Sequence, residues 1–194
     1  MKKLILFSAL SALSTIVSAQ VKFGAQVGAN LGSGKETVSY GGVSETDKYT
    51  SKFGIVIGGF AQMPISTSID FRPELNYIQK GGKYSESYSI LGTSYTTTDE
   101  ITMNYIEVPL NIIYSVAAGN GTVFLGGGPA IGLGISGNNK VSSGGKSEST
   151  TIKFDGNKDA KDSYDHYKAL NVGFGFMAGY ELTNGEIGRA HVWT

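Results

Sequence analysis

Cysteine is absent from the 194 residues of this sequence, so disulfide bonds play no part in its stability. After residue 19 the chain also lacks any apolar run long enough to form a transmembrane helix. Its 16 basic and 16 acidic residues balance, so no strongly basic surface is expected. These absences exclude a disulfide-stabilised scaffold and a helical membrane protein, and they give no reason to expect a nucleic-acid partner.

The first 19 residues have the pattern of a secretory signal peptide. Lys2 and Lys3 form a basic start, residues 4–17 form an apolar core, and Val17-Ser18-Ala19 is a small-residue cleavage pattern. We expect cleavage after Ala19. Removal of the two lysines leaves 14 basic against 16 acidic residues, a formal charge of −2.

The segment from Asn104 to Ser115 alternates apolar and polar side chains with a period of two. A strand with one apolar face and one polar face separates two media. Its length of about ten to twelve residues suits a tilted strand that crosses a bilayer, whereas soluble strands usually have about five or six. The apolar face carries Ile106, Val108, Leu110, Ile112 and Tyr114, and the other carries Tyr105, Glu107, Pro109, Asn111 and Ser115.

Five further segments show the same alternation, with branched or aromatic side chains on one face and glycine or polar side chains on the other. The sharpest split is in the segment that contains Asp70, Arg72, Glu74 and Lys80, whose four charges cannot face lipid. The five segments are 21–32, 52–65, 68–83, 122–136 and 169–182.

The connections between these segments alternate between long polar stretches and tight turns. Asn120-Gly121 and Asn184-Gly185 are strong turn signals. With both termini in the periplasm, the long connections all face outside, as transmembrane barrels require. The long connections are 33–51, 84–102 and 137–168, and the short ones are 64–67, 117–121 and 183–185.

The sequence therefore predicts an all-β fold, an antiparallel up-and-down transmembrane β-barrel with about six strands present. The alternative is a soluble sandwich or lipocalin-like barrel with half-buried strands. Such a soluble fold would not require long and short connections to alternate.

Four segments resemble the PorT-like outer-membrane β-barrel proteins: FGAQVGANLG, FRPELNYIQKGGK, NYIEVPLNIIYS and GFGFMAGYELTNG. The resemblance covers about residues 20 to 185, in order and with similar spacing. It implies a small barrel of eight strands in the full-length protein, and it allows an accessory role in a secretion system. An eight-stranded barrel has an interior that side chains fill.

The last residues, EIGRAHVWT, depart from the family pattern, which would place a hairpin and a final strand there. Residues 186–192 match the translation of a sequencing-adapter read, so we predict that 186–194 are non-native and that the barrel at 20–185 is C-terminally truncated. His191 and Trp193 should then carry no functional weight. A divergent short C-terminus is the alternative, and the sequence of the gene's 3′ end decides between them.

The charged residues that are expected to face inward are the strongest candidates for a functional site. If the two central strands pair as a hairpin, a guanidinium should lie between carboxylates within the lumen. The cluster is either a polar plug or a selectivity filter, and we favour the plug because an eight-stranded barrel is too narrow for an open pore. Its members are Asp70, Arg72, Glu74, Asn76, Glu107 and Asn111.

Glycines recur on the face that is expected to point inward. We interpret them as room for large side chains from facing strands, together with strand curvature, rather than as a ligand cavity. They stand at positions 24, 28, 54, 58, 126, 128, 132, 134, 173, 175 and 179.

Other chemical signals are weak. His166 has Asp162, Ser163 and Asp165 nearby, which is too little for a catalytic site in a polar loop. The DGNKD motif at residues 155–159 lacks the rest of a calcium-binding loop and is typical of a turn. We expect no catalytic residues, no cofactor and no metal.

We therefore expect a non-enzymatic integral outer-membrane protein of a Gram-negative cell, with a structural or surface-interaction role. Its expected partners are outer-membrane lipid, the barrel-assembly machinery and an unidentified surface or secretion partner, with no nucleic acid. The alternatives are a narrow porin-like channel or accessory secretion barrel and, less favoured, a soluble periplasmic ligand-binding barrel.

Overall fold

The computed structural model describes residues 21–40, 43–90, 92–157 and 162–193. The expected signal peptide and its cleavage site after Ala19 lie outside these residues. Within them, no helix is long and apolar enough to cross a membrane.

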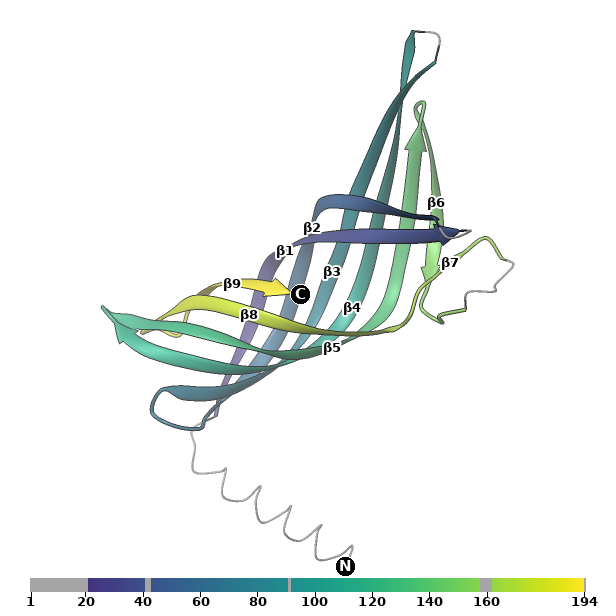
Figure 1. The fold of residues 1–194 in the computed structure, drawn as a ribbon. Helices are drawn as coiled ribbons and strands as arrows, with labels where there is room; N and C mark the ends of the chain where they lie inside the picture. Colours follow the sequence, from purple (N-terminus) through teal and green to yellow (C-terminus); the bar gives the residue numbers. More distant parts are fainter. Residues whose placement is uncertain (1–20, 41–42, 91, 158–161, 194) are drawn as a thin grey trace, which may run out of the picture.

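The described residues form one curved nine-stranded sheet (Figure 1). The all-β, antiparallel prediction is confirmed, apart from one short parallel pair, but the expected count of about six strands is too low. The strands are β1 (Lys22–Tyr40), β2 (Val43–Pro64), β3 (Ile69–Ile90), β4 (Thr93–Ala118), β5 (Gly121–Ser143), β6 (Lys146–Lys153), β7 (Asp165–His166), β8 (Leu170–Leu182) and β9 (Ile187–Trp193).

Strands β1 to β5 are antiparallel neighbours in chain order, as an up-and-down arrangement requires. Strand β5 then pairs with two partners along its length: β8 lies against residues 121–133 and β6 against residues 137–143. The sheet is open, because β9 pairs only with β8 among the described residues. Lys22 of β1 and Glu181 of β8 nevertheless form an ion pair of 3.2 Å across the opening.

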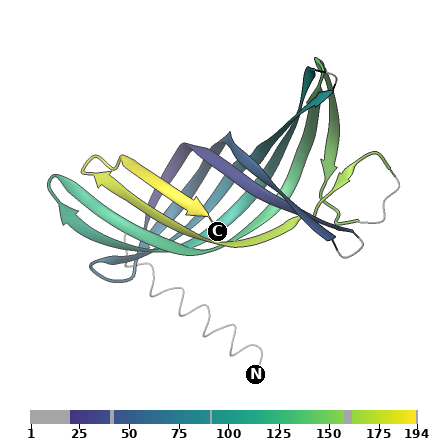
Figure 2. The same ribbon diagram turned by 45° about the horizontal axis from the view of Figure 1, so that its top comes forward.

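The expected long loops are largely two-stranded ribbons, which is a correction to the sequence-based prediction. Strands β1 and β2 stay paired to Tyr40 and Val43, and β3 and β4 stay paired to Ile90 and Thr93. Figure 2 shows these ribbons continuing beyond the body of the sheet. Serine, threonine and tyrosine fill them, so both faces are polar and no apolar period marks the strands, although threonine and tyrosine favour β-structure.

Cross-strand side chains stabilise the ribbon of β3 and β4. The hydroxyl groups of Ser87 and Thr96 are 2.9 Å apart. The rings of Tyr88 and Tyr95 stack with their centroids 5.7 Å apart. Such pairs are the local interactions that hold a sheet together where no core lies beneath it.

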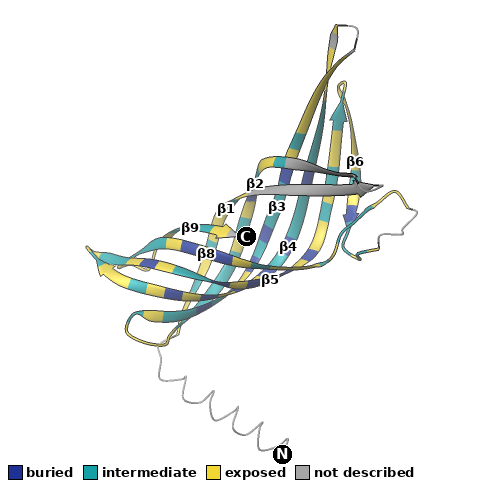
Figure 3. Cartoon of the chain, in the orientation of Figure 1, coloured by how far each residue is buried: buried dark blue, intermediate teal, exposed yellow. Residues whose placement is uncertain are grey.

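The two faces of the sheet differ as the alternation predicts (Figure 3). On the convex face, apolar side chains such as Leu125 and Leu133 are 58% and 53% exposed. The concave face, which we call the lumen, holds buried polar side chains and a small apolar cluster of Ile113, Phe124 and Met177. Exposed apolar side chains therefore surround a charged interior.

The two ends of the sheet differ: tight turns connect the strands at one end, and the long ribbons extend from the other. The turn after β4 contains Gly119 with a φ of 60°, and the turn after β8 contains Gly185 with a φ of 87°. Glycine adopts such values without strain because it has no Cβ. We call the end with the ribbons the outer end.

Candidate lumen site

Strands β3 and β4 position most of the candidate cluster. Their register pairs Arg72 with Asn111 and Asn76 with Glu107, so alternate residues of both strands point into the lumen. Arg72 is 1% exposed and Asn111 is fully buried. Glu74, Asn76 and Glu107 are also buried, so the structure places these five predicted residues in the interior, with Asp70 at its margin.

Arg72 lies between two aromatic rings. Its Cζ atom is 4.8 Å from the centroid of Phe60 on β2 and 4.9 Å from that of Phe124 on β5. Its Nε and Nη2 atoms donate to Oε1 of Gln62, at 3.1 and 2.5 Å. The nitrogen of that amide donates to Asp70 at 2.7 Å.

The expected position of Arg72 between carboxylates is therefore wrong. No ion pair of Arg72 occurs within 4.0 Å among the described residues, and a neutral amide separates it from Asp70. The register explains the difference, because Asn111, not Glu107, stands opposite Arg72. Cation–π contacts with two rings take the place of the expected carboxylates.

Glu74 accepts hydrogen bonds from its own strand and from three others. Asn76 of its own strand and Gln26 of β1 each donate to Oε2 at 3.0 Å, and Asn111 of β4 donates to Oε1 at 3.4 Å. Arg189 of β9 forms a bidentate pair with the carboxylate, at 2.5 and 2.9 Å. Four side chains therefore donate to this buried carboxylate, and the bidentate contact from Arg189 is charge-assisted.

Glu107 pairs with a different cation. Lys80 of β3 donates to Oε1 of Glu107, and its Nζ lies 5.4 Å from the ring centroid of Tyr105. Nearer the outer end, Lys52 and Glu100 form a second ion pair of 2.7 Å. The lumen wall of β2, β3 and β4 thus carries charged side chains at successive levels.

Glycines make room for these side chains. A Cβ atom at Gly24 would come closer than 3.0 Å to the ring of Phe60, and one at Gly179 would do the same to Phe124. At Gly58 the obstacle would be Asn76. These close approaches agree with the prediction that inward glycines face large side chains.

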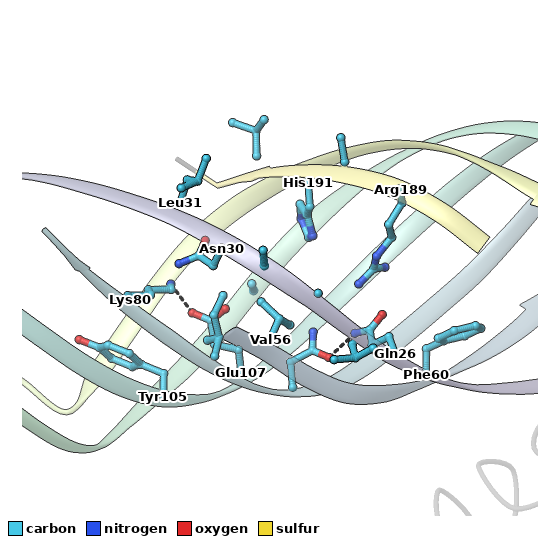
Figure 4. A pocket seen from close by; sticks show the side chains of 18 of the residues that line it. Gln26, Asn30, Leu31, Val56, Phe60, Lys80, Tyr105, Glu107, Arg189 and His191 are labelled. Carbon is cyan, nitrogen blue, oxygen red and sulfur yellow. Dashed lines mark hydrogen bonds and ion pairs between the residues drawn. The ribbon is translucent and has the colours of Figure 1, made fainter. Parts of the chain in front are cut away.

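A cavity of about 1690 Å³ occupies the rest of the lumen (Figure 4). Gln26 and Asn30 of β1 face it from one side, and Lys80 and Glu107 from the other. Its lining runs from Lys22 and Glu181 near the tight turns to Tyr49 and Ile101 toward the ribbons and includes Arg72, so the cavity extends past the level of Arg72.

The polar segment after β6 brings together the residues that were weak catalytic candidates. The Nδ1 atom of His166 lies 2.6 Å from Asp155, and its Nε2 atom lies 2.7 Å from Asp162. Ser163 forms no contact with this histidine among the described hydrogen bonds. The same residues hold no group of three or more metal-ligating side chains.

The DGNKD motif begins with a local turn, in which Asp155 accepts from the backbone N–H of Asn157 at 3.0 Å. The rest of the motif lies partly outside the described residues. Hydrogen bonding to His166, followed by Lys153, lowers the pKa of Asp162 to about 2.

An antiparallel sheet with a lipid-compatible outer face and a charged lumen defines the class of transmembrane β-barrel proteins. Residues 17–191 match the outer membrane protein β-barrel domain family, and the chain belongs to that family. No curated protein and no solved structure matches the chain.

Several lumen residues were not assigned to the cluster from the sequence. Gln62, Phe60 and Lys80 lie on the inward face that alternation identifies, but only register shows which of them meet. Alternation places Phe124 on the inward face, but it does not indicate what an apolar side chain does there. Arg189 falls in residues 186–194, whose expected non-native origin stays a prediction.

Proposed function

We propose that this protein is a small non-enzymatic outer-membrane barrel protein with a polar, largely filled lumen and a structural or surface-interaction role. The observation that carries the proposal is the separation of side chains: exposed apolar residues on the convex face and buried polar and charged residues on the concave face. A soluble barrel has no reason to expose so many apolar side chains.

Packing at the level of Arg72 supports a filled lumen. The guanidinium is fixed by two rings and by Gln62, and the nearby apolar cluster includes Phe124. A fixed cation at this level disfavours the passage of other cations. This level of the lumen is suited to stability, not to transport.

The ribbons support a role at the surface. They extend past the apolar part of the sheet as paired strands, and the ribbon of β3 and β4 exposes polar side chains. The proposed partners are outer-membrane lipid, the barrel-assembly machinery that inserts such proteins, and a surface or secretion partner of the kind that the PorT-like resemblance allows. No cofactor is required by this role.

A narrow channel is the second candidate, and the cavity of about 1690 Å³ is the observation that favours it. Ions could enter such a space from the outer end and would meet the ion pair of Lys80 and Glu107. Passage would then require a route past Arg72.

Planar-bilayer recording of the refolded chain tests the choice. The filled-lumen proposal predicts no reproducible conductance steps. Steps that change on Glu107→Ala but not on Glu148→Ala, an exposed site on β6, would instead establish the channel. Extraction with alkaline carbonate tests membrane integration, since a soluble barrel would leave the membrane.

A further inference from the structure

The end of β6 and the residues that follow it pack against the lumen face of β4 and β5. We call residues 152–157 the strap. Ile152 is 3% exposed, and the ring of Phe154 packs edge-on against Tyr105, with their centroids 5.6 Å apart. Phe154 also covers Gly134, where a Cβ atom would come closer than 3.0 Å to its ring. Because Tyr105 lines the cavity, the strap lies at its outer edge.

Backbone contacts join the strap to the segment around β7. The N–H of Gly156 donates to the carbonyl of Tyr167 at 2.9 Å, and the N–H of Tyr167 donates to the carbonyl of Lys153 at 2.8 Å. Strands β6 and β7 pair in parallel over only two positions. So few backbone bonds give a weakly stabilised element, whose position depends on side-chain contacts.

His166 provides those side-chain contacts from both ring nitrogens. Nδ1 contacts a carboxylate oxygen of Asp155, within the strap, and Nε2 contacts one of Asp162. An ionised carboxylate only accepts hydrogen bonds, so both contacts are hydrogen bonds only when both nitrogens carry protons. The imidazole side chain is 8% exposed, whereas its two partners, Asp155 and Asp162, are 49% and 38% exposed.

Charged neighbours complete the cluster. Lys153 pairs with Asp162 at 2.9 Å, and its Nζ lies 3.6 Å from the ring centroid of Tyr164. Asp155 and Asp162 are thus the acidic groups that contact the imidazole, and Lys153 is the cation on the far side of Asp162.

We propose that His166 is a proton-operated latch, which holds the strap against β4 and β5 at the edge of the cavity while the imidazole is doubly protonated and releases it on deprotonation. Loss of one proton turns one of the two hydrogen bonds into a contact between a ring lone pair and a carboxylate. The latch requires neither conduction through the lumen nor any residue of 186–194.

The direction of the pH dependence follows from the contacts. Hydrogen bonds to Asp155 and Asp162 raise the pKa of His166 above its ordinary value of 6.5. Its contribution is therefore fully present below pH 6.5 and is lost as the pH rises through the higher value of the folded protein. The carboxyls of Asp155 and Asp162 need to be ionised, and their pKa values lie below the ordinary value of 3.8. The latch is therefore strongest between pH 3.8 and pH 6.5.

Hydrogen exchange of the refolded full chain in detergent tests the latch. The readout is the protection of a peptide covering residues 150–157, corrected for the intrinsic pH dependence of exchange. We expect protection that is high below pH 6.5, falls by up to roughly tenfold per pH unit above it, and levels off once the imidazole is deprotonated in the folded protein as well. The His166→Gln variant should show low protection without this pH dependence, while Glu148→Gln should match the parent chain.

Proton magnetic resonance of the two histidines gives a second readout that does not depend on strap opening. His166→Gln assigns the resonance, and Asp155→Asn should lower the midpoint of its titration. Protection that stays flat with pH in the parent chain, or a midpoint unchanged by Asp155→Asn in a variant with normal heat-modifiable gel mobility, would overturn the proposal.

Discussion

Arg72 Nε donates to Gln62 Oε1 at 3.1 Å, so a buried guanidinium in this lumen has a neutral amide as its nearest acceptor. The amide nitrogen of Gln62 in turn donates to Asp70 at 2.7 Å. The positive charge is thus linked to a carboxylate through Gln62, while Phe60 and Phe124 occupy its two faces. These contacts from β2 and β5 fix the Arg72 side chain within the lumen.

Gln62→Leu should destabilise the folded protein, because it leaves Arg72 without its acceptor and Asp70 without a donor. The expected loss is roughly 1–3 kcal/mol in the free energy of unfolding, measured by urea titration in lipid vesicles. Gln79→Leu is the matched control, since the side chain of Gln79 is only partly buried and donates over a longer 3.3 Å bond. Equal losses for the two variants would contradict the importance of this layer.

Gly128→Ala and Gly28→Ala should differ sharply, although both positions lie on the lumen face. A Cβ at Gly128 would strike the backbone carbonyl of Leu110, whereas one at Gly28 would meet nothing within 4 Å. Backbone cannot rotate out of the way, so we expect Gly128→Ala to cost about 1–3 kcal/mol or to prevent folding. Heat-modifiable gel mobility measures the folded fraction, and an unaffected Gly128→Ala variant would contradict the register between β4 and β5.

Lys80→Met should leave the buried carboxylate of Glu107 without its cation. We expect a loss of roughly 3–5 kcal/mol in unfolding free energy. The double variant Lys80→Met with Glu107→Gln should recover much of that loss, because it removes the charge that was left unpaired. Urea titration of both single variants and of the double variant gives the coupling energy, and strictly additive losses would show that the two side chains do not interact.

Ile131→Arg should lower the free energy of unfolding, because Ile131 is 51% exposed on the convex face, which we expect to contact lipid. An arginine near the middle of the bilayer costs about 2–4 kcal/mol. Asn138→Arg, on the part of β5 that pairs with β6, should cost little because it lies outside the bilayer. Vesicle-based unfolding compares the two, and equal small effects would place Ile131 in water.

Alternation in the sequence was sufficient to predict which side chains face the lumen, because a strand that separates lipid from a polar interior shows its period in every second residue. Arg72, Glu74 and Glu107 are buried as their positions in that period require. The same rule failed in the ribbons, because their sequences show no apolar alternation. Loops were therefore predicted where the structure has strands.

Contacts between strands could not be predicted from alternation. The pairing of Arg72 with Asn111 depends on where the connection between β3 and β4 turns, at Ile90 and Thr93, and on the register that follows from it. A shift of two residues keeps every side chain on the same face but changes every partner. For that reason the members of the cluster were identified more reliably than their contacts.

A nitroxide scan of residues 104–115 tests the central claim most directly, and the absence of cysteine allows each label to be attached at a single introduced site. In lipid vesicles, accessibility to oxygen should peak at Ile106, Val108, Leu110, Ile112 and Tyr114, and should be low at the residues between them. Oxygen accessibility without a period of two, or greater access of a water-soluble relaxation agent at the five apolar positions, would contradict a strand whose apolar face meets lipid.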